Sequence, residues 1–135
     1  MYTIRRTQAL DRSFESRRAG SFIENKAWTG ADTLLAEATT RGERMPIVFA
    51  AAEGDVGAGL TYWAVLEQLD VDPGDRAFGR KPRTRYSFVE LTRLPSGRHL
   101  TDLTKKSDGK SLSESYIRPY ALCRTPRFLQ AEDPH

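Results

Sequence analysis

The side chains of this chain that could do chemistry are aromatic and basic rather than catalytic. The sequence has no glycine-rich phosphate loop, no zinc-binding spacing of Cys and His, and no H-E-x-x-H motif. His99, in a polar turn, and His135, at the last position, lack a local setting of carboxylate and nucleophile. Cys123 follows an apolar stretch, which is typical of a buried structural thiol. We therefore expect no catalytic residue, no metal site and no cofactor.

Trp28 has the most unusual surroundings of the aromatic residues, because it lies in the polar connection 24–30 just before an expected helix. An indole exposed there would offer a flat face for a base, and such stacking contributes about 1–3 kcal/mol. The alternative is that Trp28 packs in the core and attaches the helix to a sheet. Tyr62 and Trp63 are consecutive in an expected strand and point to opposite faces, so only one of them can share a pocket with Trp28. The predicted base-binding residues are Trp28, Asn25, Ser21, Tyr62 and Trp63.

Basic residues concentrate between positions 76 and 85, where five of ten residues are Arg or Lys and none is acidic. Closely spaced cations release counterions when they meet a polyanion, so this segment predicts a phosphate-contacting edge. The alternative is a solvated loop. Contacts of this kind position a nucleic-acid backbone without reading its sequence. The predicted phosphate-binding residues are Arg80, Lys81, Arg83 and Arg85, with Lys105 and Lys106.

Length and composition favour one compact domain. The chain has 135 residues, a formal net charge of +3 and 39% hydrophobic residues, which is enough apolar material for a single core. No apolar run approaches the about 20 residues of a membrane span, and the first eight residues lack the apolar segment of a secretory signal. A single cysteine excludes an internal disulfide. We expect a cytoplasmic protein with one domain over residues 1–130 and a flexible tail at 131–135.

The elements that must position these residues are helices near the start of the chain and antiparallel strands after them. Leu10 and Phe14 lie one turn apart in the first helix, and Thr29 with Asp32 has the spacing of a cap at the start of the second. The expected helices are 9–18 and 29–41; the expected strands are 21–24, 46–52, 60–71 and 84–94, with closing strands at 120–123 and 127–129 and a helical turn from Ser111. This order predicts an α+β fold, with a small mixed or antiparallel β-barrel of five to six strands flanked by helices.

Three segments resemble the PUA-like superfamily, which includes the EVE, YTH and ASCH domains. They are Asn25-Lys26-Ala27-Trp28 with the helix that follows, Met45-Pro46-Ile47-Val48-Phe49-Ala50, and the strand Leu60-Thr61-Tyr62-Trp63-Ala64-Val65-Leu66. The Asn-x-x-Trp element is similar to the place where YTH domains put a tryptophan of their methyl-base cage. Residues 116–123 also resemble segments of PUA-like domains in modification-dependent restriction systems. The resemblance implies a barrel of five or six strands that reads a modified or flipped nucleotide.

The residues and the resemblance together favour a non-enzymatic module that binds DNA or RNA and captures a base, modified or unmodified, in an aromatic pocket. Capture of a single base is weak, so we expect a partner protein or a fused nuclease to add affinity. One alternative is an ASCH-like amidohydrolase acting on modified nucleosides, with Lys26 as base, Glu24 as acid and Thr29 nearby. Another is a protein-interaction domain with no nucleotide role. Base capture requires Trp28 to be half-exposed and close to the basic segment.

Overall fold

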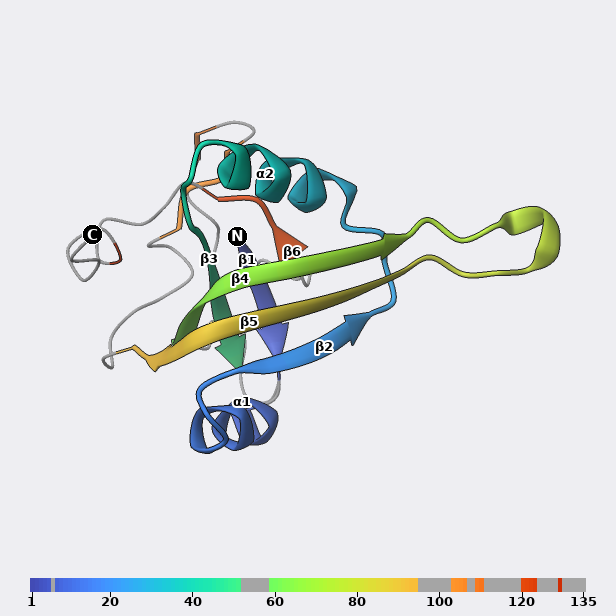
Figure 1. Cartoon of the computed structure of the whole chain (residues 1–135). Coiled ribbons are helices and arrows are strands. Elements are labelled where there is room, and N and C mark those ends of the chain that lie inside the picture. Colours follow the sequence, from blue (N-terminus) through green and yellow to red (C-terminus); the bar gives the residue numbers. More distant parts are fainter. Residues whose placement is uncertain are drawn as a thin grey trace.

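The computed structural model describes residues 1–5, 7–51, 59–94, 103–106, 109–110, 120–123 and 129. These residues form one mixed sheet of six strands in the order β2-β5-β4-β3-β1-β6. Five of the strands curl into a half-barrel, and the two-residue β6 extends its edge. Helices α1 and α2 lie at opposite ends of the curled sheet (Figure 1). The α+β class is confirmed, but the sheet is a half-barrel rather than a closed barrel.

The elements follow the sequence-based expectations closely for both helices and four strands. β5 shows why, because Thr84, Tyr86 and Phe88 are buried while Arg83 and Arg85 are exposed, which is the alternation of a strand with one face on a core. The bounds are β1 Tyr2–Arg5, α1 Thr7–Glu15, β2 Gly20–Glu24, α2 Thr29–Thr40, β3 Met45–Ala51, β4 Leu60–Asp72, the 3-10 turn η1 Arg76–Phe78, β5 Arg83–Arg93 and β6 Tyr120–Ala121.

Strand β1 is the element that the sequence analysis missed. It pairs in parallel with β3, with Tyr2 opposite Val48, and antiparallel with β6, with Thr3 opposite Tyr120. Tyr2 is 1% exposed and Thr3 is fully buried, so this short strand lies inside the molecule. The parallel β1–β3 pair makes the sheet mixed.

The two faces of β3 enter two different hydrophobic clusters. Ile47 and Phe49 belong to the first cluster, which also contains Leu10 of α1 and Ala31 of α2. Val48 and its neighbour Ala50 belong to the second cluster. A strand buried on both faces is expected to be apolar at every position, as β3 is. The second cluster is completed by Tyr2, Leu60, Leu94, Leu103, Ala121 and Leu129.

Helix α2 begins at Thr29, the residue that was expected to cap it. Trp28 is the N-cap, with no side-chain cap hydrogen bond, and its carbonyl oxygen accepts from the Asp32 amide at 3.0 Å. The prediction of Thr29 as the cap is therefore wrong by one position. The helical turn from Ser111, most of the closing strand 127–129, both histidines and the tail 131–135 lie outside the described residues.

The connection between β4 and β5 projects from the body as a hairpin ribbon with η1 at its far end (Figure 1). β3 pairs with β4 only as far as Leu66, and β2 pairs with β5 only as far as Thr84. The ladder between β4 and β5 ends where Asp72 faces Arg83. We call residues 70–85 the arm and residues 73–82 its tip.

Candidate nucleic-acid interface

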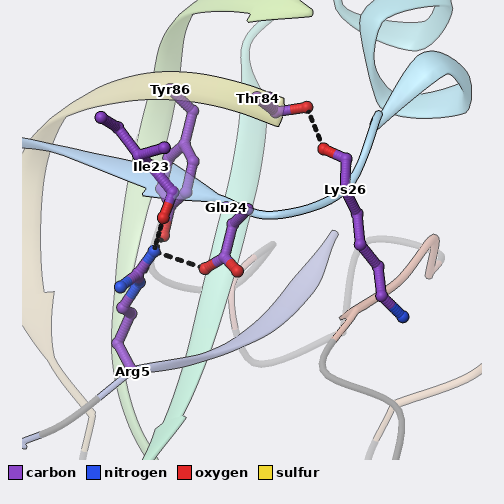
Figure 2. A network of polar contacts seen from close by, with 6 residues as sticks. All are labelled: Arg5, Ile23, Glu24, Lys26, Thr84 and Tyr86. Atoms are coloured by element: carbon purple, nitrogen blue, oxygen red, sulfur yellow. Dashed lines mark hydrogen bonds and ion pairs between the residues drawn. The ribbon is translucent and has the colours of Figure 1, made fainter. Parts of the chain in front are cut away.

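Trp28 is sealed in the core, so the expectation of a half-exposed indole is wrong. The residue is 2% exposed, and its ring stacks on Tyr86 with centroids 4.9 Å apart. Its backbone N–H donates to the buried Oγ1 of Thr84 at 2.9 Å. The same hydroxyl donates to the carbonyl oxygen of Lys26 at 2.6 Å (Figure 2). These contacts draw the end of the connection into the sheet, and the buried ring offers no surface to a base.

The other predicted base-binding residues do not converge on Trp28. Tyr62 is 2% exposed, and its hydroxyl donates to Asp11 and accepts from Arg93 at 3.0 Å. Trp63 packs against the second cluster, and its buried indole N–H has no partner among the residues that the structure describes. Ser21 and Asn25 are exposed on β2 and in the bend after it. The predicted aromatic pocket is therefore not formed by these residues.

Glu24 and Lys26, the pair of the hydrolase alternative, do not meet. Glu24 Oε1 pairs with Arg5 Nη2 at 2.5 Å, while the Lys26 side chain extends away from both (Figure 2). Burial raises the pKa of Glu24 above its ordinary value, and the Arg5 guanidinium opposes this rise. The pair with Arg5 accounts for the position of this carboxylate.

Arg5 spans the open side of the half-barrel, a role that the sequence did not indicate. β1 and β2 are not neighbours in the sheet, yet Arg5 Nη2 also donates to the carbonyl oxygen of Ile23 at 2.9 Å (Figure 2). Arg5 Nε donates to the hydroxyl of Tyr86 at 3.2 Å, and its guanidinium lies 4.4 Å from the ring centre of Phe22. A planar fork with several donors suits this set of partners. One side chain thus joins two strands that no backbone ladder connects.

The predicted phosphate-binding residues lie in two separate places. Arg80, Lys81, Arg83 and Arg85 are all exposed on the arm. Lys105 instead forms a bridge with Cys123, which follows β6 at the opposite edge of the sheet, and the Lys106 amide donates to Leu122. The two lysines therefore lie away from the arm, and the predicted phosphate-binding residues do not form one continuous surface. The residues next to Lys105 and Lys106 in the sequence do not indicate at which edge of the sheet these lysines lie.

The charge of the arm differs between its root and its tip. At the root, Asp70 faces Arg85 and Asp72 faces Arg83 across the strands. These four residues and Ile23 line a shallow depression of about 210 Å³. Carboxylates opposite guanidinium groups reduce the positive potential there.

The tip retains free positive charge. Arg80 Nη2 lies 3.5 Å from Asp72 Oδ1, but Arg76 and Lys81 make no ion pair with any residue that the structure describes. The carboxylate of Asp75 accepts from the Ala77 amide at 3.0 Å, so it caps the 3-10 turn. The tip is therefore the positively charged part of the arm, and Arg76 belongs to it although it was absent from the predicted set.

The turn of the tip holds a defined shape. Asp75 and Arg80 exchange two backbone hydrogen bonds of 2.8 Å each, and the Gly74 amide donates to Asp72 Oδ1 at 2.9 Å. Gly79 has a φ of +69°, which closes the turn. Phe78 lies within this turn, between Asp75 and Arg80, and is 85% exposed. An aromatic residue inside the basic run 76–85 was the signal that could have drawn attention to it.

The described part of the chain contains neither a candidate metal site nor a candidate membrane-spanning helix. It contains no group of three or more His, Cys, Asp or Glu side chains arranged to hold a metal ion. Neither of its helices combines the length and apolar character needed to cross a bilayer.

Comparison with models of protein families gives no match for this chain, and a search of curated proteins finds no similar sequence.

Proposed function

We propose that this chain is a nucleic-acid-binding module of PUA-like architecture that contacts the phosphates of DNA or RNA through the tip of its arm. The observation that carries the proposal is the exposure of Arg76 and Lys81, without ion-pair partners in the described part of the chain, on a ribbon that projects beyond the sheet. Cations presented in this way release counterions from a nucleic acid. The role is binding rather than catalysis.

This proposal replaces the aromatic pocket as the contact site. Trp28 is sealed against Tyr86, so capture of a base at that position is not part of it. A few phosphate contacts give weak, salt-sensitive binding without sequence preference. A partner protein or an attached nuclease would therefore supply the remaining affinity.

Salt dependence of binding tests the proposal. The probe is a fluorescein-labelled strand of about 20 nucleotides, titrated by anisotropy between about 25 and 200 mM NaCl. Removing two phosphate contacts with Arg76→Ala/Lys81→Ala is expected to lower the slope of log K against log salt by about 1.4. A methylated strand is expected to bind as the plain one does, because the contacts are to phosphates.

A matched variant separates local contact from net charge. Arg12→Ala/Arg41→Ala removes the same charge from exposed positions of α1 and of the end of α2. It is expected to leave the slope unchanged. Equal losses in the two variants, or no binding by the unaltered chain at the lowest salt, would contradict the proposal.

Removal of the whole tip gives a second test. Asp72 and Arg83 face each other at the end of the ladder, so an Asn-Gly turn can join them in place of residues 73–82. None of the removed residues belongs to either hydrophobic cluster. We expect the shortened chain to fold, as measured by its thermal transition, and to lose its binding.

A further inference from the structure

Phe78 is the most exposed large hydrophobic residue that the structure describes. It is 85% exposed, whereas the other exposed one, Ile23 at the root of the arm, is 44% exposed. No aromatic ring and no cation of the described residues lies against the Phe78 ring. Single exposed apolar residues are common, but this ring stands at the end of a projecting element between Arg76 and Lys81, which make no ion pair with the residues that the structure describes.

Backbone hydrogen bonds fix the turn that carries Phe78. The Phe78 amide donates to the carbonyl oxygen of Asp75 at 3.2 Å, and the Gly79 amide donates to that of Arg76 at 3.2 Å. The Asp75–Arg80 bridge closes the turn below them. A turn fixed in this way presents Phe78 with little conformational entropy to lose on binding.

We infer that Phe78 stacks on an unpaired base of a single-stranded nucleic acid, while Arg76 and Lys81 contact the flanking phosphates. The inference rests on the proposed function and names its substrate class. A phenyl ring accepts any base, because every base has a π-face, and this suits a site whose remaining contacts are to phosphates. The flanking positive charge favours a polyanion over an apolar partner protein.

The charges at the root of the arm favour a single strand over a duplex. A ribbon lying along a duplex groove would bring its root to the phosphates, where Asp70 and Asp72 offset Arg85 and Arg83 and leave no net attraction. Insertion of a ring between paired bases also requires unstacking, which costs about a few kcal/mol per step. Stacking on an unpaired base requires neither contact between the root and the phosphates nor unstacking of paired bases, because only the tip has to reach the base.

The test is a cycle that removes the ring and the base separately. The probes are a thymine strand and an abasic strand of equal length, which carry the same phosphates, and the proteins are the unaltered chain and Phe78→Ala. The unaltered chain is expected to bind the thymine strand about 5- to 150-fold more tightly than Phe78→Ala does, and the two proteins are expected to bind the abasic strand equally. Phe78→Trp, which keeps an aromatic ring, should bind the thymine strand more tightly than Phe78→Ala does. Ile23→Ala should bind it as the unaltered chain does.

The outcomes separate this inference from the proposed function. Equal binding of the thymine strand by Phe78→Ala and the unaltered chain, with the salt slope still dependent on Arg76 and Lys81, overturns the stacking and leaves the phosphate contacts. A loss of equal size on both strands also overturns it, because the base would then have no part. If a duplex binds more tightly than the single strand does, and this binding depends on Phe78, the single-strand assignment is overturned. Failure of the unaltered chain to bind any strand overturns both proposals.

Discussion

At the scale of single residues, Thr84 fixes the backbone on both sides of Ala27. It is fully buried, and its hydroxyl satisfies both the Trp28 amide and the Lys26 carbonyl. Lys26 and Trp28 lie in the connection between β2 and α2, so one side chain of β5 fixes this connection on the sheet. Loss of the hydrogen bond to a buried backbone donor costs about 1–3 kcal/mol.

Thr84→Val tests this role, because valine has the shape of threonine without the hydroxyl. We expect it to lower the free energy of unfolding by about 1–3 kcal/mol, since the Trp28 amide loses its acceptor. Urea denaturation followed by tryptophan fluorescence measures the change. The control is Thr40→Val, where an exposed hydroxyl donates to Ala36 within the helix; it should cost less than about 1 kcal/mol. Equal effects of the two substitutions would show that the bond to Trp28 contributes little.

The error over Trp28 shows where the sequence stops being informative about a site. A strand over 84–94 was predicted, and Tyr86 and Phe88 are both buried on one side of the observed strand. That Tyr86, which is 58 positions after Trp28, stacks on the indole depends on strand register, which no local pattern encodes. Polar neighbours along the chain therefore made a core residue look exposed. The separation of Lys105 from the arm is invisible in the sequence for the same reason.

At the scale of elements, the arm depends on two glycines with different constraints. Gly74 has a φ of +75°, and a Cβ placed there would lie 2.5 Å from the backbone oxygen of Arg80. Gly79 has a φ of +69°, but a Cβ there would meet nothing within 4 Å. Gly74 therefore supplies both the left-handed backbone and the close approach of the two strands, whereas Gly79 supplies only the backbone conformation.

Gly74→Ala and Gly79→Ala form a matched pair that separates these two costs. Gly79→Ala is expected to destabilise the turn by about 1–2 kcal/mol, from the positive φ alone. Gly74→Ala should destabilise it further, because backbone atoms must move apart. Amide hydrogen exchange at Asp75 and Arg80, whose amides bond across the turn, measures the local opening. Equal protection in the two variants would mean that the close approach at Gly74 does not hold the tip.

Elements with a clear period were predicted from the sequence, whereas those that depend on distant partners were not. β4 was expected at 60–71 and is found at Leu60–Asp72, because apolar residues at both its faces and a Pro-Gly turn after it mark its extent. β1 has four residues and ends on Arg5, so it shows too little periodicity to be recognised alone. It exists because β3 and β6 provide hydrogen bonds on both of its edges.

At the scale of the whole molecule, the half-barrel is completed by a side chain where a closed barrel would have a ladder. Arg5 of β1 donates to Tyr86, to Ile23 and to Glu24 across the open side. The Arg5 and Glu24 side chains are 23% and 20% exposed, so their interaction is less screened than that of a surface pair. Arg5 therefore links β1 to β2, the two strands on either side of the opening in the half-barrel.

Arg5→Lys is expected to weaken this link by about 1–3 kcal/mol of unfolding free energy. An ammonium group keeps the charge but cannot bond to the Tyr86 hydroxyl and to β2 at once with the geometry of a guanidinium. Urea denaturation measures the loss. Arg41→Lys is the control, because its pair with Glu43 is more than half exposed and contributes little. If Arg5→Lys is as stable as the unaltered chain, the charge alone holds the open side together.

Arg5→Met adds a dependence on pH whose sign follows from Glu24. Burial already raises the pKa of Glu24, and removal of Arg5 takes away the main interaction that lowers it. The neutral acid then favours the folded chain, an advantage present below the ordinary value of 4.5 and lost as the pH rises through the raised pKa. The destabilisation by Arg5→Met should therefore be larger at neutral pH than near pH 4. A destabilisation by Arg5→Met that does not change with pH would mean that water solvates the Glu24 carboxylate once Arg5 is removed. The open side of the half-barrel would then be accessible to solvent.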